Sequence, residues 1–301
     1  MKPLRPFFIF FFLAVFFLAG GCSLPFYGPV DFIVTADMRE YTLDYDEQYF
    51  RGAVKAAADL SGGDFMVSPG DIDPPDKVYA VIREYLGPDY LWYPVVGNHE
   101  AETDSDMAWL REFNAGGTLL PNILNTGPSG SEETTFSFDA GSCHFAVVNQ
   151  YFDGSSDIGT DGDVPDALYT WLKTDLETTD KPIIFVFGHE PAFPRADADS
   201  GRERHMDDSL NQHPANRDRF WALLKQYSAV YFCGHTHNYS AVQINGVWQI
   251  DAGHARGIQD TGAKSTFLRV SVSRKGEAVL NTYRLNDAFN GYVLYEQIDL
   301  F

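Results

Sequence analysis

The chain has 301 residues, of which 45% are hydrophobic, so it can bury a large core in one α/β domain or in two smaller ones. Acidic residues outnumber basic residues by 42 to 22, which gives a formal net charge of −20. Such a negative chain repels the nucleic-acid backbone and anionic lipid surfaces, and we therefore expect no nucleic-acid partner.

The N-terminal segment is typical of an export signal. Two basic residues precede an apolar run over residues 7–18, which is short for a membrane span, and small residues then lead to Cys22. The segment resembles the lipobox of bacterial lipoproteins, which predicts a signal peptide over 1–21, lipidation of Cys22 and a tether over 22–29. We expect an exported protein, anchored to a membrane by its lipid and facing the periplasm or the cell exterior. An uncleaved anchor and an ordinary signal peptide are the alternatives.

Strand-like and helix-like segments alternate along the rest of the chain, which favours an α/β fold with mostly parallel strands joined by helices. We expect helices near residues 45–60, 75–86, 104–114, 165–178 and 216–227. We expect strands near residues 30–36, 65–69, 91–96, 182–187, 229–233, 241–244, 247–250, 267–272, 278–283 and 292–298, and an antiparallel hairpin over 134–148. The expected architecture is a single domain over 30–301, a four-layer αββα sandwich of two mixed β-sheets packed together with helices outside.

A polar segment over residues 192–215 lacks clear periodicity and lies between two of the expected strands. Long loops of this kind are often walls of a substrate site. The segment is locally basic, through Arg195, Arg202, Arg204, His205 and His213. It either holds an anionic group or is a solvated loop.

Cys143 and Cys233 are the only cysteines after Cys22, and each lies inside an apolar, strand-like run. An oxidising compartment would permit a disulfide between them. Two separate buried thiols are an equally good interpretation.

Candidate metal ligands follow several expected strands, where a parallel sheet brings its loops together. These residues are Asp37, Asp71, Asn98 with His99, His189, and His235 with His237. Taken singly, each has an ordinary explanation as a turn, a helix cap or a packed histidine. Together they predict one metal centre, because carboxylate, amide and imidazole donors suit manganese, iron or zinc.

The motifs that carry these residues resemble, in type and in order, those of the calcineurin-like metallophosphoesterases. In chain order they are Asp37, Gly70-Asp71, Gly97-Asn98-His99-Glu100, Gly188-His189 and Gly234-His235-Thr236-His237. The purple acid phosphatase branch is the most similar.

The resemblance implies two divalent or trivalent metal ions bridged by Asp71. Asn98, His189 and His235 would complete one site, and Asp37 and His237 would serve the other. Such a centre clamps the phosphoryl oxygens and activates a hydroxide for in-line attack on phosphorus. His99 would be the catalytic acid that protonates the leaving group.

The sequence departs from the family pattern at two positions. Many members have a histidine two residues after the first aspartate, where this chain has Arg39, and purple acid phosphatases have a tyrosine where this chain has Pro74. Asp73 is a candidate substitute ligand or substrate contact. A guanidinium cannot ligate a metal, but Arg39 could contact a phosphate oxygen and take part in catalysis.

We therefore expect an enzyme, a metallophosphoesterase acting on a small-molecule phosphate ester. Phosphomonoesters are slightly favoured, because Arg39 and the basic loop would suit a doubly charged group. A phosphodiesterase of the cyclic-nucleotide or glycerophosphodiester type and a catalytically decayed surface-binding lipoprotein are the alternatives. His254 follows another expected strand and is either a substrate contact or a hydrogen-bonded structural residue. The oligomeric state is not indicated.

Overall fold

The structure is a computed structural model that describes residues 28–38, 50–159, 161–260 and 262–301. The expected signal peptide, the lipidation site Cys22, nearly all of the tether, and Arg39 therefore lie outside the described residues. Among the described residues, no helix combines the length and the apolar character that crossing a bilayer requires.

One mixed sheet has six strands in the order β13-β12-β11-β1-β2-β3. Strands β1, β2 and β3 are parallel to one another, while β11, β12 and β13 continue the sheet antiparallel. The strands are β1 (Val30–Val34), β2 (Phe65–Pro69), β3 (Leu91–Val95), β11 (Thr266–Val272), β12 (Ala278–Leu285) and β13 (Tyr292–Asp299).

The other mixed sheet has seven strands in the order β4-β5-β6-β7-β8-β10-β9. Its parallel centre consists of β6, β7, β8 and β10, and the predicted hairpin is β5 with β6. The strands are β4 (Ile123–Thr126), β5 (Phe136–Ala140), β6 (Cys143–Val147), β7 (Ile183–Phe187), β8 (Val230–Cys233), β9 (Tyr239–Ile244) and β10 (Val247–Ala252). Edge strand β4 was not expected from the sequence, because only Ile123 and Leu124 are apolar there.

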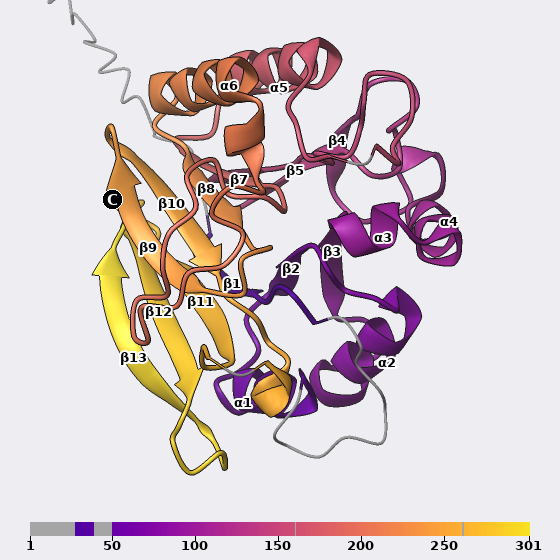
Figure 1. The fold of residues 1–301 in the computed structure, drawn as a ribbon. Helices are drawn as coiled ribbons and strands as arrows, with labels where there is room; N and C mark the ends of the chain where they lie inside the picture. The colour runs from indigo at the N-terminus through magenta and orange to yellow at the C-terminus, as the bar shows by residue number, and fades with distance from the viewer. Residues whose placement is uncertain (1–27, 39–49, 160, 261) are drawn as a thin grey trace, which may run out of the picture.

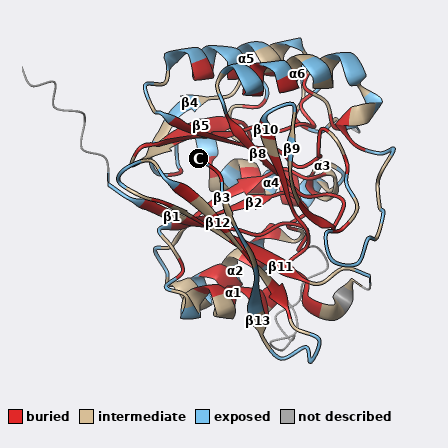
Figure 2. Cartoon of the chain, turned by 90° about the vertical axis from the view of Figure 1, so that its left-hand side faces the viewer, coloured by how far each residue is buried: buried red, intermediate tan, exposed pale blue. Residues whose placement is uncertain are grey.

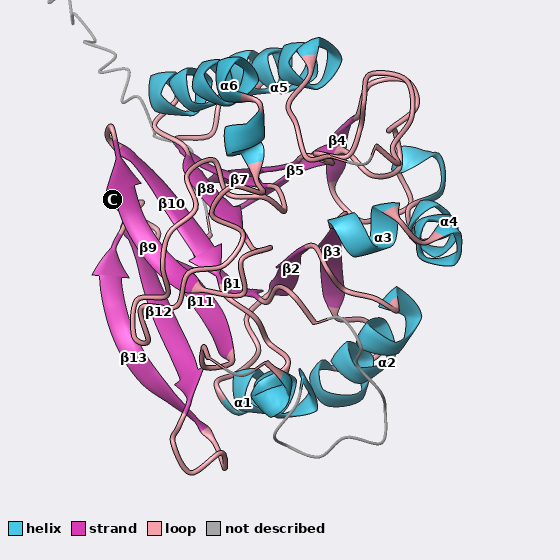
Figure 3. Ribbon diagram, in the orientation of Figure 1, coloured by secondary structure: helices cyan, strands magenta, loops and turns pink. Residues whose placement is uncertain are grey.

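Helices cover the outer faces of the two sheets (Figures 1 and 3), as the sequence predicted. Helices α1 and α2 cover the first sheet, α5 and α6 cover the second, and the short helix α3 leads into α4 beside β3. The helices are α1 (Phe50–Asp59), α2 (Pro75–Leu86), α3 (Asn98–Ala101), α4 (Asp104–Phe113), α5 (Asp166–Thr178) and α6 (Pro214–Gln226). The two-sheet α/β fold with flanking helices is confirmed.

The core between the sheets is built mainly from aromatic residues. Phe32 of β1 lies at its centre, with its ring 5.2 Å from the rings of Phe145 and Phe185 and 5.5 Å from that of Phe65. Alternate residues of the same strands, such as Ile33, point outward and pack against the helices. Figure 2 shows the buried layers as a continuous red band through the molecule.

Both described cysteines are buried, free thiols. Cys143 lies in β6 and Cys233 lies in β8, with β7 between these strands. The interpretation as two separate thiols is therefore confirmed.

Candidate metal centre

The candidate ligand residues lie in loops at the carboxyl ends of β1, β2, β3, β7 and β8. Backbone hydrogen bonds hold these loops together: Asp37 N donates to Gly70 O at 3.1 Å, and Gly234 N donates to His189 O at 2.8 Å. The parallel centres of the two sheets therefore bring residues that are up to 200 positions apart into one site.

The first donor group consists of Asp37, Asp71 and His237. Their ligand atoms lie within 4.8 Å of one another, and all three residues are buried. His237 Nε2 lies 3.4 Å from Asp37 Oδ1 and has no hydrogen-bond partner among the described residues. Burial and then the Asp71 charge raise the pKa of Asp37, while burial lowers the pKa of His237. Two adjacent buried carboxylates and an unbonded imidazole nitrogen fit a metal cation between them.

The second donor group consists of Asp71, Asn98, His189 and His235. His189 Nδ1 donates to the Pro69 carbonyl at 2.7 Å, which leaves a lone pair on Nε2. That Nε2 atom lies 3.3 Å from Asn98 Oδ1 and 3.3 Å from Asp71 Oδ1. Burial lowers the pKa of His189 to about 3, so the ring is neutral at pH 7.

The fourth member, His235, lies beside His189, with 5.1 Å between the ring centres. Its Nε2 donates to the Asp208 carbonyl at 2.7 Å, which leaves Nδ1 with the lone pair. The neutral imidazole of His189, the amide oxygen of Asn98 and the carboxylate of Asp71 fit a second cation of the manganese, iron or zinc type, and His235 lies beside them. Asp71 belongs to both donor groups.

The ligand loops have unusual backbone conformations. Asp37, Asp71, His235 and His237 have φ angles of 54°, 53°, 71° and 56°, in the left-handed region. L-residues rarely adopt this region, and Asp and His are among the types that tolerate it best. The sharp turns that result direct these side chains back toward one point.

Two motif glycines make room for the aspartates. A Cβ atom on Gly234 would lie 2.6 Å from Asp37 Oδ2, and one on Gly97 would overlap the backbone nitrogen of Asp71. Any side chain at these positions would displace a donor, which explains why glycine precedes the ligand in these motifs.

Glu100 connects two of the ligand loops. Its side chain is fully buried, and its carboxylate accepts hydrogen bonds from Gly97 N at 2.7 Å, Asp71 N at 3.0 Å and Ile72 N at 2.7 Å. Burial and the neighbouring Asp71 raise the pKa of Glu100, and the N–H donors oppose this by stabilising the ionised form. The structure thus places Glu100 as the bridge between the Asp71 and Asn98 loops.

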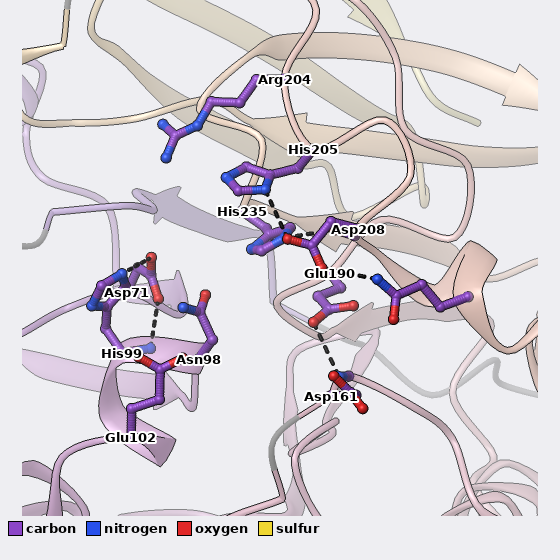
Figure 4. A pocket seen from close by; sticks show the side chains of 12 residues that line it. Asp71, Asn98, His99, Glu102, Asp161, Glu190, Arg204, His205, Asp208 and His235 are labelled. Atoms are coloured by element: carbon purple, nitrogen blue, oxygen red, sulfur yellow. Dashed lines mark hydrogen bonds and ion pairs between the residues drawn. The ribbon is translucent and has the colours of Figure 1, made fainter.

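His99 lies at the opening of the site (Figure 4), where its side chain is 24% exposed. Its Nε2 is 3.8 Å from Asp71 Oδ2, and its Nδ1 is 3.9 Å from Asp73 Oδ2. Asp73 thus lies on the His99 side and does not belong to the group of Asp37, Asp71 and His237.

A cavity of about 140 Å³ opens beside His99. Asp71, Asn98 and His99 line one side, and the loop over 192–215 lines the opposite side (Figure 4). The full lining consists of Asp71, Asn98, His99, Glu102, Asp161, Gly162, Glu190, Arg204, His205, Asp208, Gln212 and His235. Residues of the basic loop therefore form a wall of the cavity, and its holding of an anionic group stays a prediction.

The same loop provides donors that the motifs did not predict. His205, Asp208 and His235 have ligand atoms within 4.8 Å of one another. His205 Nδ1 lies 3.1 Å from Asp208 Oδ2, and burial with the adjacent Arg204 charge lowers the pKa of His205. The local excess of basic residues indicated the loop, but no sequence signal singled out Asp208.

Carboxylates form much of the cavity wall. Glu102, Asp161 and Asp208 are exposed, whereas Glu190 is buried and accepts hydrogen bonds from Tyr151 Oη at 2.8 Å and Gly162 N at 3.1 Å. Burial raises the pKa of Glu190 to about 7. The sequence analysis did not predict this acidic wall, because its residues come from four separate segments.

His254 is fully buried and does not line the cavity. Its Nε2 donates to the Ala263 carbonyl at 3.2 Å, and its Nδ1 accepts from Arg256 N at 3.4 Å. Both ring nitrogens are therefore used within its own loop, as the structural interpretation of this residue expects.

Comparisons with known proteins identify a family and similar folds. The sequence model of the family described as calcineurin-like phosphoesterase matches residues 31–239. Among solved structures, "GAP50 the anchor in the inner membrane complex of Plasmodium" is similar with a TM-score of 0.58 and 14% identity, over 90% of this chain and 88% of that one. "Structure of PhoD" is similar with a TM-score of 0.58 and 12% identity, over 89% of this chain and 68% of that one. Identities this low establish the fold alone, and no curated protein matches the chain.

Proposed function

The chain belongs to the calcineurin-like phosphoesterase family, and from this premise we propose that it hydrolyses phosphate esters with a dinuclear metal centre. The observation that carries the proposal is the position of Asp71, whose carboxylate belongs to the buried group with Asp37 and His237 and also lies 3.3 Å, through Oδ1, from His189 Nε2. Asp37 and His237 would complete one site, and Asn98, His189 and His235 the other. Manganese, iron and zinc all suit these donors.

When bound, two such ions neutralise the phosphoryl oxygens and lower the pKa of water, so that hydroxide is available at neutral pH. The protein's own residues do the rest. His99 is at the cavity opening beside Asp71, where its imidazole can protonate a departing alkoxide. Arg204 is in the cavity wall, where its guanidinium can contact an oxygen of the substrate phosphate. Arg39, which lies outside the described residues, is a second candidate for that role.

We propose phosphomonoesters as the preferred substrates, because Arg204 and His205 border the cavity. A diester is the second candidate, since Glu102, Asp161 and Asp208 would repel the additional charge of a monoester. We also propose, from the resemblance of the motifs, that the chain belongs to the purple acid phosphatase-like branch, although Pro74 stands where that branch has a tyrosine.

The test uses p-nitrophenyl phosphate, bis(p-nitrophenyl) phosphate and glycerol phosphate, with the wild type and the variants Asp71→Asn and His99→Ala. Asp218→Asn, at an exposed position on α6 that does not line the cavity, is the matched control. Asp71→Asn should abolish activity on every ester. Full activity of Asp71→Asn, or a wild type that is inactive with each of the three metals, would contradict the proposal.

The role of His99 has a separate signature. Alkyl leaving groups need a proton, whereas p-nitrophenolate leaves without one, so His99→Ala should slow glycerol phosphate hydrolysis by about 10²- to 10⁴-fold and p-nitrophenyl phosphate hydrolysis far less. Equal slowing of both esters would show that His99 is not the leaving-group acid.

We also propose that residues 30–301 form one exported domain, lipidated at Cys22 and tethered by residues 22–29. The N-terminal sequence supports this. Incorporation of a labelled fatty acid into the wild type but not into Cys22→Ala would agree with it; equal labelling of the two would contradict it.

A further inference from the structure

Asp260, which lies outside the residues 31–239 that the family model matches, contacts the candidate ligand His237. It follows the short 3₁₀ helix η3 (Gly257–Gln259) in the connection between β10 and β11. Its side chain is 12% exposed, and its Oδ2 atom is hydrogen-bonded to His237 Nδ1. The carboxylate therefore lies on the side of the imidazole opposite to the nitrogen that faces Asp37.

Two arginines from the loop over 192–215 fix this carboxylate. Arg202 Nη1 donates to Asp260 Oδ1 at 2.6 Å, and Arg204 Nη1 donates to Asp260 Oδ2 at 3.2 Å. Arg202 also donates from Nη2 to the His237 carbonyl at 3.0 Å and from Nε to Asn238 Oδ1 at 2.8 Å. Two segments, the loop that carries Arg202 and Arg204 and the turn that carries His237, thus hold Asp260 in place by polar contacts.

The contacts also select the tautomer of His237. Arg204 Nη1 lies against both Asp260 Oδ2 and His237 Nδ1. With the proton on Nδ1, the ring donates to Asp260 Oδ2 while Arg204 donates to the same carboxylate; without it, the ring lone pair would lie against a carboxylate oxygen, which is repulsive. His237 Nε2, which has no hydrogen-bond partner among the described residues, then carries the lone pair toward Asp37.

We propose that Asp260 is a positioning residue of the metal centre, which orients His237 and strengthens its Nε2 as a donor to the ion shared with Asp37 and Asp71. This inference rests on the proposed function. Asp260 matters because this ion would have few protein ligands. Among the described residues, the donor group found there consists of Asp37, Asp71 and His237 alone. Carboxylates that bond to a ligand histidine in this way typically change metal affinity by about 10- to 100-fold.

The test compares Asp260→Asn, Asp260→Glu and the control Asp199→Asn. Asparagine keeps the size and one acceptor but removes the charge, and glutamate restores the charge on a longer side chain. Asp199 is an acidic residue within the loop over 192–215 that pairs with Lys264 Nζ at 3.0 Å and has no contact with His237 among those described. Each full-length protein is freed of metal with a chelator, checked for folding by circular dichroism, and titrated with Mn²⁺ by calorimetry.

We expect Asp260→Asn to weaken one of two manganese sites by about 10- to 100-fold and to leave the other unchanged. Asp260→Glu should recover part of the affinity, and Asp199→Asn should equal the wild type. Nitrogen-15 NMR of the metal-free protein should show the Nδ1–H tautomer of His237 in the wild type and a mixture in Asp260→Asn, which a purely structural role would not produce.

Wild-type affinity at both sites of Asp260→Asn would overturn the inference and leave the proposed function intact. Equal weakening of both sites, or an Nε2–H tautomer in the wild type, would also overturn it. If Asp260→Asn does not fold, Asp260→Glu is measured in its place: a partial loss of manganese affinity at one site supports the inference, and wild-type affinity at both sites overturns it. A wild type that binds no manganese overturns the inference together with the manganese form of the proposed function.

Discussion

Replacement of Glu100 by glutamine tests whether this residue holds the two ligand loops together. The carboxylate accepts three backbone N–H bonds, two on Oε2 from Asp71 and Gly97 and one on Oε1 from Ile72. Glutamine has one oxygen, so it can keep two of these bonds at most, and its NH₂ group then faces a third N–H donor. A hydrogen bond to a charged group contributes about 1.5–3 kcal/mol, so we expect Glu100→Gln to lose about 2–3 kcal/mol of unfolding free energy.

Urea unfolding at pH 8, with chelator and separately with manganese, measures this loss. With a slope of about 2–3 kcal/mol per molar urea, the midpoint should fall by about 1 M, and manganese should stabilise the variant less than the wild type. Glu102→Gln, an exposed position two residues later, is the matched control and should unfold like the wild type. A Glu100→Gln midpoint within about 0.2 M of the wild type would refute the assignment of Glu100 as the bridge.

Three further predictions concern the surrounding structure. Burial lowers the pKa of His254 to about 4, so between pH 6.5 and pH 5 the unfolded chain binds a proton at this residue and the folded chain does not. The free energy of unfolding should therefore fall by about 2 kcal/mol as the pH falls from 6.5 to 5. His254→Gln, compared with the wild type by urea unfolding in chelator, should lack this part of the loss. Arg284 and Asp197 form a buried ion pair at 2.7 Å, so Arg284→Met should lower the free energy of unfolding by about 3–5 kcal/mol. Adding Asp197→Asn to this variant should restore part of the loss, because the unpaired buried charge is then removed. An Arg284→Met variant as stable as the wild type would contradict the buried ion pair. Gly234→Ala should displace the nearby carboxylate of Asp37 and reduce the metal content of the protein, which elemental analysis measures. An unchanged metal content would show that the loop can shift to accommodate the added methyl group without displacing Asp37.

The sequence predicted the central strands of the sheets clearly because strands such as β2, β6, β7 and β8 are buried on both faces. Apolar runs such as 183–187 leave little ambiguity when both sides of a strand are covered. It missed β4, where two of the four residues are polar, and α3, which is a single turn formed by the third ligand motif. Short elements of this kind depend on tertiary contacts more than on periodicity.

The central part of the candidate site was also predictable, because its donors sit in glycine motifs directly after strands. Asp71, Asn98, His189 and His237 are brought together in the way that the motif order implies. Asp208 and Asp260 were not predictable, because they lie on irregular loops whose paths are set by contacts with arginines and histidines distant in sequence. The role of Arg39 stays a prediction.

The left-handed backbone at Asp37, Asp71, His235 and His237 has a consequence for how this scaffold can change. Strain of this type amounts to about 1–3 kcal/mol at each position, and glycine would relieve it. A variant with glycine at these four positions would lose metal ligands but could have a higher thermal stability, because the backbone strain is removed. A selection for heat tolerance alone should enrich glycine or asparagine at these turns, and one that also demands hydrolysis should not.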